Sequence, residues 1–316
     1  MGTNLPQLLE ARGYRGRVVP VQHLRDLQEN IETHHREGHL DEAFYQERLT
    51  GFVFGPPASL AEARSLIVVA AGQPQVRFTF TWNGKRTPII VPPTYLHWRE
   101  TDKQVENVLA EMLGPKSYTV AQAVLPKKLL AVRSGLAAYG RNNIAYVAGM
   151  GSFHRLVAFY SDFPCEQDEA GTQFPWQEPK MMERCQHCHA CLHHCPTGAI
   201  TSERFLLRAE RCITFHNEKA GNVPFPAWLD ASWHNCLVGC LHCQLVCPEN
   251  KGFLAWIEEG VEFSAEETAL LLEGTPLAQL PAATVRKLEQ SDMVDLIDIL
   301  PRNLRVLLTG ESMNTC

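Results

Sequence analysis

The pattern of apolar and polar positions predicts alternating helices and strands in the first half of the chain. Apolar residues recur at helical spacing among many charges over residues 21–47, which predicts amphipathic helical structure. Ser59, followed by Glu62 three positions later, is a capping-box signature for a short helix. The continuous apolar run 65–71 then predicts a buried strand that ends at Gly72.

The following residues continue this pattern. An alternating stretch at 77–82 runs into Asn83-Gly84, which is a strong signal for a β-hairpin. Further segments have the apolar spacing of two helices and a strand, at residues 101–113, 126–136 and 144–160 respectively. Residues 1–163 are therefore expected to form one mixed α/β domain.

Three further regions are expected beyond residue 163. Residues 164–184 hold three prolines and several charges, which indicates a linker, and a cysteine-rich module follows at 185–250. Residues 251–316 are expected to form a helical C-terminal cap. Within it, Ser264 and Glu267 begin a helix that reaches Leu272, and residues 284–300 form another. The predicted fold class of the whole chain is α+β.

Composition and charge place the chain among ordinary globular proteins. Hydrophobic residues make up 45% and charged residues 20%, and no apolar stretch reaches the roughly 18–20 residues that a membrane span needs. The first residues carry no secretion signal, so a cytoplasmic location without a membrane partner is expected. The net charge of −6 argues against wholesale binding of nucleic acid.

The number and spacing of the cysteines indicate metal or cluster binding. Of the 11 cysteines, all but Cys165 and Cys316 lie between Cys185 and Cys247, at spacings typical of metal or cluster ligation rather than of disulfides. We interpret Cys165 as a small, half-buried residue and Cys316 as a free thiol.

Two runs carry the iron–sulfur signal. The first, beginning at Cys185 and ending in Cys195-Pro196, has the C-x2-C-x2-C-x3-C-P spacing of bacterial ferredoxins. The second, Cys236-x3-Cys240-x2-Cys243-x3-Cys247-Pro, ends in the same way. Zinc also accepts four cysteines, but its sites seldom show such a triple with a trailing Cys-Pro. The sequence therefore predicts two 4Fe–4S clusters with crossed ligation.

Nine cysteines are available for eight ligand positions. Crossing assigns the first cluster to Cys185, Cys188, Cys191 and Cys247. The second cluster takes Cys195, Cys240 and Cys243, and either Cys212 or Cys236 completes it. Spacing alone leaves this last choice open.

These motifs resemble the tRNA epoxyqueuosine reductases, a cobalamin-dependent iron–sulfur family related to the reductive dehalogenases. The resemblance covers about residues 60–250 and rests on the cysteine module, with its Arg211-Cys212-Ile-Thr segment, and on two upstream segments at 64–70 and 133–142. It implies Cys212 as the eighth ligand and gives no ligand role to Cys236. It also implies a nitroreductase-like cobalamin domain in front of a ferredoxin-like module.

The resemblance further implies a cofactor site and an electron donor. No Asp-x-His-x-x-Gly corrinoid signature is present in the sequence, so a base-off cobalamin without a histidine ligand is expected. The donor would be a reduced flavodoxin or ferredoxin. The residues expected to bind the cobalamin are Gly135, Gly140, Arg141, Asn142, Asn143 and Ser152.

One position departs from the family. Ala121 occupies the place of the proton-donating aspartate, and alanine cannot supply a proton. Tyr139 with Arg141 or Lys127, as in the tyrosine–base pair of reductive dehalogenases, is a candidate replacement, although simple core packing of Tyr139 is the plainer interpretation. His154 is another candidate acid.

Both tRNA and a small molecule are candidate substrates. Between Met112 and Ser161 the chain has six basic residues and no acidic residue until Asp162, which indicates either a solvated face or a phosphate-binding surface. An alternative function is a non-catalytic electron-transfer or corrinoid-reactivating protein, and a flavin in place of cobalamin is a third possibility.

Overall fold

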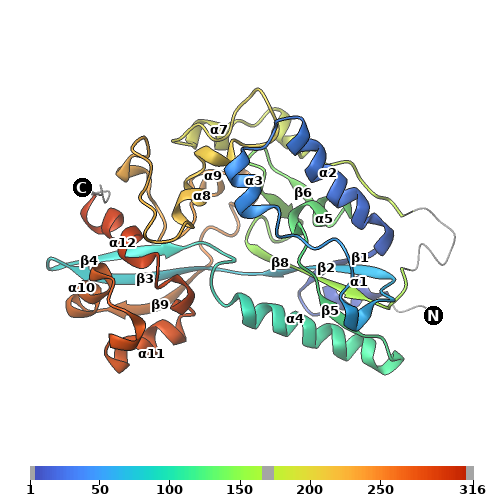
Figure 1. Cartoon of the computed structure of the whole chain (residues 1–316), viewed down its shortest axis with the longest axis horizontal. Helices are drawn as coiled ribbons and strands as arrows, with labels where there is room; N and C mark the ends of the chain where they lie inside the picture. Colours follow the sequence, from blue (N-terminus) through green and yellow to red (C-terminus); the bar gives the residue numbers. More distant parts are fainter. Residues whose placement is uncertain (1–3, 166–173, 311–316) are drawn as a thin grey trace. The chain divides into compact units, whose positions relative to one another are not determined.

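The computed structural model describes residues 4–165 and 174–310. Figure 1 shows the elements coloured along the chain. By packing, the chain divides into two compact units, and both draw on separate parts of the sequence. Unit 1 combines Met1–Gln73, Trp98–His189 and Ser202–Leu207, whereas unit 2 combines Pro74–His97, Ala190–Thr201 and Arg208–Cys316.

Unit 1 is built on a four-stranded antiparallel sheet. Its order is β1 (Arg15–Pro20), β2 (Ser65–Gly72), β8 (His154–Ser161) and β5 (Val120–Gln122). Every residue of β2 except its last is buried. The reason is that both α4 (Trp98–Leu113) and α5 (Lys127–Arg133) contact this strand. The remaining elements are α1 (Leu5–Glu10), α2 (Leu24–Arg36), α3 (Glu42–Arg48) and a two-stranded ribbon of β6 (Ala137–Tyr139) and β7 (Ala145–Val147).

Unit 2 contains a three-stranded sheet in the order β4 (Lys85–Val91), β3 (Gln75–Trp82) and β9 (Ile257–Phe263). Asn83 and Gly84 both have positive φ, at 49° and 74°, as a tight hairpin turn between β3 and β4 requires. Helices α10 (Ala265–Glu273), α11 (Ala282–Gln290) and α12 (Leu300–Thr309) follow β9. Three short helices lie in the cysteine module: α7 (Ala190–His194), α8 (Ile213–Asn217) and α9 (His242–Leu245).

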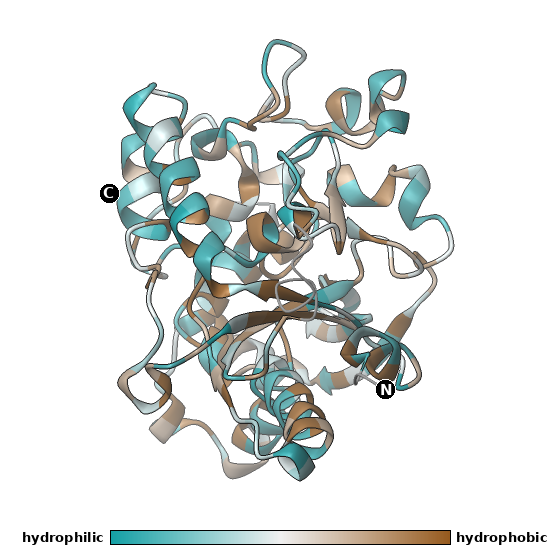
Figure 2. Ribbon diagram, turned by 90° about the vertical axis from the view of Figure 1, so that its right-hand side faces the viewer, coloured by the Kyte–Doolittle hydropathy of each residue, from teal (hydrophilic) through white to brown (hydrophobic). Residues whose placement is uncertain are grey.

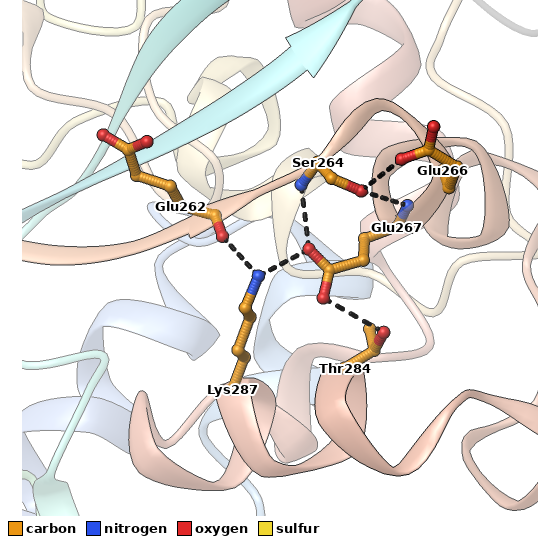
Figure 3. A network of polar contacts seen from close by, with 6 residues as sticks. All are labelled: Glu262, Ser264, Glu266, Glu267, Thr284 and Lys287. Carbon is orange, nitrogen blue, oxygen red and sulfur yellow. Dashed lines mark hydrogen bonds and ion pairs between the residues drawn. The ribbon is translucent and has the colours of Figure 1, made fainter.

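The start of α10 shows how local sequence sets an element boundary. Ser264 accepts a hydrogen bond from the backbone N–H of Glu267, and the Glu267 carboxylate accepts one from the backbone N–H of Ser264 (Figure 3). Lys287 and Thr284 of α11 donate to the same carboxylate, at 2.6 and 3.2 Å. The predicted capping box is confirmed, and it also joins α10 to α11.

Most of the predicted elements are confirmed. The helical stretch 21–47 contains α2 and α3, and the strand at 65–71, the hairpin and the helices at 101–113 and 126–136 are all present. Apolar residues predominate in several strands, whereas the helices carry both apolar and polar residues, as Figure 2 shows. The α+β class is therefore confirmed.

Three predictions of local structure were wrong. The Ser59–Glu62 signature yields a single 3-10 turn, and the helix expected at 284–300 is broken into α11 and α12, with Asp292 between them at φ 53°. The C-terminal cap is not wholly helical, because Ile257–Phe263 forms β9, parallel to β3. Its glutamates and Gly260 disfavour a strand, so pairing with a distant strand overrides local preference.

The predicted boundaries at residues 163, 184 and 250 stay a prediction. Part of the expected linker, residues 166–173, lies outside the described residues. The following part packs in unit 1, where Phe174 is 5% exposed and the Trp176 ring stacks on His23 at 4.3 Å. Within the described residues, no helix is long and apolar enough to cross a membrane.

A buried ion pair joins α4 to the sheet of unit 1. Arg155 of β8 donates from both Nε and Nη2 to the Asp102 carboxylate, and the two side chains are only 14% and 7% exposed. Gln122 of β5 donates to the same carboxylate at 3.0 Å. Removing one partner leaves a buried charge without compensation, which is far more costly than losing an exposed pair.

We therefore expect Asp102→Asn to lower the free energy of unfolding by about 3–5 kcal/mol in urea denaturation. Glu106 of the same helix provides a matched control, because its contact with Lys103 is exposed. Glu106→Gln should change the free energy of unfolding by less than about 1 kcal/mol. Equal unfolding midpoints for the two variants would contradict a stabilising role for the Asp102–Arg155 pair.

Candidate iron–sulfur site

The second half of the first cysteine run and the whole of the second run form a structural repeat in unit 2, whereas Cys185 and Cys188 belong to unit 1. Helix α7 contains Cys191 and leads into Cys195-Pro196, and helix α9 contains Cys243 and leads into Cys247-Pro248. The two helices contact each other. Each run therefore contributes one short helix that is followed by a Cys-Pro step. Because α7 and α9 are in contact, the Cys-Pro step of each run can reach the cluster of the other run, as crossed ligation requires.

Three of the four thiols predicted for the second cluster lie near one another. Burial raises the pKa of Cys240 well above its ordinary value, and the charges of Cys212, Cys236 and Cys195 raise it further. Burial, together with the charge of Cys195, likewise raises the pKa of Cys212. Thiols that oppose one another's ionisation in this way are suited to a cationic metal centre, because a bound metal reverses the effect and stabilises the thiolates.

The choice between Cys212 and Cys236 remains a prediction, but the surroundings of the two thiols differ. Cys236 is 1% exposed, and burial alone accounts for the upward shift of its pKa. Cys212, in contrast, is also influenced by the charge of Cys195, the proline-preceding ligand of the first run. Cys212 is the thiol whose ionisation is coupled to that of both Cys195 and Cys240, which supports it as the eighth ligand.

The segments that carry these thiols are held by polar contacts. The Arg211 Nε atom donates to the carbonyl of Thr197 at 2.9 Å, which joins the residue before Cys212 to the turn after Cys195. The Arg211 guanidinium also lies 5.2 Å from the Trp228 ring centroid. Arg211 therefore fixes the separation of two candidate ligands without being a ligand itself.

A buried arginine of α12 organises the loop after Cys212. Arg302 is 1% exposed, and its guanidinium donates to four backbone carbonyls and one side-chain oxygen at 2.7–3.0 Å. The four carbonyls belong to residues 217, 219, 220 and 223. Burial lowers the pKa of Arg302 to about 10, so it keeps its charge at neutral pH. Sequence analysis missed this residue, although a charge among the apolar positions of α12 was a usable signal.

Asn303 and Asn217 extend the same network toward the second run. Asn303 Nδ2 donates to the carbonyls of Asn217 and Leu237, and Asn217 Nδ2 donates to the carbonyl of Gly239. The two donor side chains, Asn303 and Asn217, and the three acceptor carbonyls lie either between Cys212 and Cys240 or on α12. We call Arg302, Asn303 and Asn217 the carbonyl clasp.

Gly239, which precedes Cys240, is in close contact with Tyr95. Its φ is +72°, and a Cβ atom there would lie 2.7 Å from the Tyr95 hydroxyl oxygen. The Tyr95 hydroxyl donates to the Glu218 carboxylate. Burial, followed by the charge of Glu218, raises the pKa of Tyr95, so the hydroxyl keeps its proton. Tyr95 is a second residue that sequence analysis missed.

In unit 1, Arg141 lies beside the first cysteine run. Its guanidinium donates to the carbonyls of Cys185 and Cys188, at 2.6 and 3.2 Å. Tyr139 is 7% exposed and packs edge-on against Phe205, and burial raises its pKa well above the ordinary value. The catalytic roles predicted for both residues remain predictions, and the Arg141 contacts point to a part in positioning the first two ligands.

The other predicted cofactor residues lie mainly in one turn and its surroundings. Asn142 is buried and donates to the Tyr146 hydroxyl, and a Cβ at Gly140 would meet Asn142 and Tyr146 at 2.5–2.6 Å. Asn143 has φ 58°, and its carbonyl accepts from Lys128. The other two predicted cobalamin residues lie outside this turn. Gly135 follows α5 and has φ 72°, and Ser152 is buried just before β8.

His154, at the start of β8, has an unusual environment. It is 7% exposed, and burial lowers its pKa to about 4, so the ring is neutral at pH 7. Its Nδ1 atom is buried and has no hydrogen-bond partner among residues 4–165 and 174–310. Such an atom is costly unless a water or a bound group satisfies it.

Ala121 occupies the middle of β5, opposite Tyr160 of β8. The next residue, Gln122, donates to Asp102 of the buried Asp102–Arg155 pair. Burial and Arg155 lower the pKa of Lys127. Arg133, another member of the predicted basic stretch, pairs with Glu178 at 3.0 Å. Two of the six basic residues therefore have acidic partners, which weakens the interpretation of this stretch as a phosphate-binding surface.

The contact between Gly239 and Tyr95 generates a prediction about cluster content. We expect Gly239→Ala to lose the second cluster, because the new methyl group collides with Tyr95 beside Cys240. Gly198→Ala is the matched control, since Gly198 also has positive φ, at 66°, but has open space around it. Both changes carry a similar backbone cost of roughly 1 kcal/mol.

Iron analysis after anaerobic reconstitution distinguishes the two variants. Gly239→Ala should retain about half of the parent's iron, and Gly198→Ala should retain nearly all of it, because each 4Fe–4S cluster holds four iron ions. Equal iron content in both variants would show that the Tyr95 contact does not matter for the cluster.

Comparison with known proteins supports these assignments. The profile of a family described as "4Fe-4S double cluster binding domain" matches residues 184–250. This match confirms the predicted double-cluster module, whereas the assignment of individual ligands remains a prediction.

Relatives named epoxyqueuosine reductase match much of the chain. The protein from Staphylococcus aureus is 25% identical over 236 residues, which cover 72% of this chain and 58% of that protein. The protein from Burkholderia pseudomallei is 31% identical over 188 residues, which cover 54% of this chain and 44% of that protein. The chain therefore spans about half the length of the curated relatives it matches.

Solved structures show the same fold. The epoxyqueuosine reductase from Streptococcus thermophilus superposes with a TM-score of 0.64 at 18% identity, covering 98% of this chain and 81% of that chain. An epoxyqueuosine reductase solved with an epoxyqueuosine-modified tRNA stem loop superposes with a TM-score of 0.60 at 20% identity, covering 96% and 80%. The curated relatives and the double-cluster domain confirm the resemblance: the chain is similar to the epoxyqueuosine reductases over about half of their length, and the solved structures share its fold.

Proposed function

We propose that the chain is a cobalamin-dependent iron–sulfur reductase that acts like the epoxyqueuosine reductases. The observation that carries this proposal is the match of residues 184–250 to a double 4Fe–4S cluster domain, in a chain similar to the epoxyqueuosine reductases. A chain that holds two clusters moves single electrons, and the size of unit 1 exceeds what a simple electron carrier needs.

The donor set of the cysteine module fits a pair of 4Fe–4S clusters. Cys185, Cys188, Cys191 and Cys247 would hold the first, and Cys195, Cys212, Cys240 and Cys243 the second. When bound, the clusters supply low-potential electrons one at a time. The chain's own contribution is to fix the ligands, through Arg141 for the first run and through Arg211 and the carbonyl clasp for the second.

A corrinoid would be held by residues of unit 1. The buried, partnerless Nδ1 atom of His154, next to the Ser152 turn, fits a site that a bound group completes. The proposed contacts are the six predicted residues Gly135, Gly140, Arg141, Asn142, Asn143 and Ser152, of which Asn142 and Arg141 also hydrogen-bond within unit 1. When bound, the corrinoid supplies a redox-active cobalt.

The reaction needs protons from the chain. Removal of an epoxide oxygen as water consumes two electrons and two protons, and Ala121 provides neither proton. Tyr139 keeps its hydroxyl proton because burial raises its pKa, and His154 is a neutral imidazole above about pH 4. We propose Tyr139 as the candidate proton-holding group, with Arg141 placed to orient the adjacent cluster loop, whereas His154, neutral at pH 7, can accept a proton but cannot supply one.

The proposed substrate is epoxyqueuosine in tRNA or a small molecule related to it. A solved relative was captured with an epoxyqueuosine-modified tRNA stem loop, which supports the first choice. The Ala121 departure and the paired basic residues support a divergent substrate. The proposed electron donor is a reduced flavodoxin or ferredoxin, and the proposed location is the cytoplasm.

A second candidate function, that of an electron carrier, rests on Ala121 at the position of the family's aspartate. If no group replaces the missing aspartate, the chain would relay electrons to a corrinoid in another protein without transforming a substrate itself. Protein isolated with cobalamin present distinguishes the two functions. About one corrinoid per chain retained through desalting supports the reductase, and clusters without a corrinoid support the electron carrier.

The ligand assignment generates its own prediction. Cys212→Ser should remove the second cluster, because a serine hydroxyl does not replace the thiolate ligand, and the iron content should fall to about half of the parent's. Cys236→Ser should leave the iron content and the cluster spectra unchanged. The reverse result, with the loss in Cys236→Ser, would contradict the choice of Cys212 as the eighth ligand.

A further inference from the structure

The C-terminal end of helix α2 brings two histidines together through backbone geometry alone. The N–H of His39 donates to the carbonyl of His34, and the N–H of Gly38 donates to the carbonyl of His35. Gly38 has φ 69°. This pair of bonds and the left-handed glycine form a Schellman motif, in which the residue after the glycine folds back over the last turn of the helix.

A Schellman motif usually places two apolar side chains in contact at these positions. Here both positions are histidine, and the Nδ1 atoms of His34 and His39 face each other at 3.3 Å. The Glu37 carboxylate lies 3.2 Å from the same His39 nitrogen. The three ligand atoms all lie within 4.8 Å of one another.

We propose that His34, Glu37 and His39 form a binding site for one divalent transition-metal ion, separate from the iron–sulfur clusters. Two nitrogens bound tetrahedrally to zinc at 2.0–2.1 Å are about 3.3 Å apart, which is the separation found here. The set of two imidazoles and one carboxylate suits zinc, nickel or copper, and water would complete the coordination.

The surroundings favour a cation at this point. The carbonyl end of α2 carries the partial negative charge of the helix dipole. Burial and the neighbouring His39 lower the pKa of His34, whereas Glu37 raises it. His35, stacked on Tyr45 at 3.6 Å and 2.8 Å from Glu42, fixes the loop to α3 without joining the trio.

The site is open to solvent, because the side chains of His39 and Glu37 are 48% and 53% exposed. An ion can therefore enter without unfolding of the helix. Bound metal would join the last turn of α2 to the loop that leads to α3, in addition to the contacts that His35 makes there.

Cobalt(II) titration of the cluster-loaded protein tests the proposal, with visible absorption reporting coordination by imidazole and zinc competition reporting affinity. One ion per chain is expected in addition to the cluster iron. His34→Ala and His39→Ala should each weaken binding by roughly tenfold or more, because each removes a direct ligand. His35→Ala, the matched control, should bind as the parent does.

Two results would overturn the proposal. The first is the absence of a stoichiometric cobalt site in the parent protein. The second is an equal loss of binding in His35→Ala, or no loss in either ligand variant, since both would assign the ion to other surface groups. Cluster iron, measured in the same samples, should stay constant across all variants, so that failure of this site is distinguishable from failure of the cluster assignment.

Discussion

The buried Arg302 guanidinium is the interaction on which the arrangement of unit 2 depends. Moving an arginine out of water costs several kcal/mol, and each hydrogen bond to a charged group returns about 1.5–3 kcal/mol. Five such bonds, four of them to carbonyls of residues 217–223, offset that cost only while the loop keeps its present shape. The C-terminal helix α12 therefore determines the conformation of a loop far away in the sequence.

The consequence of that constraint lies at the cysteines. The loop held by Arg302 begins just after Cys212, and Asn303 and Asn217 of the carbonyl clasp hold the carbonyls of Leu237 and Gly239, just before Cys240. The cysteine thiols that bind an iron–sulfur cluster come from separate segments, and only non-covalent contacts can hold those segments together before the cluster binds. Here a polar network holds the segments of two proposed ligands, Cys212 and Cys240, and Arg211 joins the turn after a third, Cys195, to Cys212. The residues that hold the site are therefore as specific as those that would bind the iron.

The sequence predicted the parts of this site whose chemistry is local. Cysteine spacing is set by the size of a cluster, so the double-cluster module could be identified from residues 185–247 alone. Helices α2, α4 and α10 and the β3–β4 hairpin were likewise predicted, because apolar spacing, a capping box and an Asn-Gly turn act over a few residues. These features need no knowledge of distant segments.

The features that were missed depend on contacts between distant residues. The parallel pairing of β9 with β3 joins segments about 180 residues apart, and the Asp102–Arg155 pair spans 53 residues. Arg302 lies in the C-terminal region 251–316, which was expected to act only as a cap, yet its acceptors belong to the cysteine module. Neither the partner nor the burial of such a side chain can be inferred from its neighbours in the sequence.

Mössbauer spectroscopy of the anaerobically reconstituted protein tests the central claim most directly, because it reports both the type and the number of clusters. Two cubane clusters predict about eight iron ions per chain, nearly all in the quadrupole doublet of diamagnetic 4Fe–4S centres. Stoichiometric zinc in place of iron, or about four iron ions in a single cluster, would contradict an electron relay through two clusters.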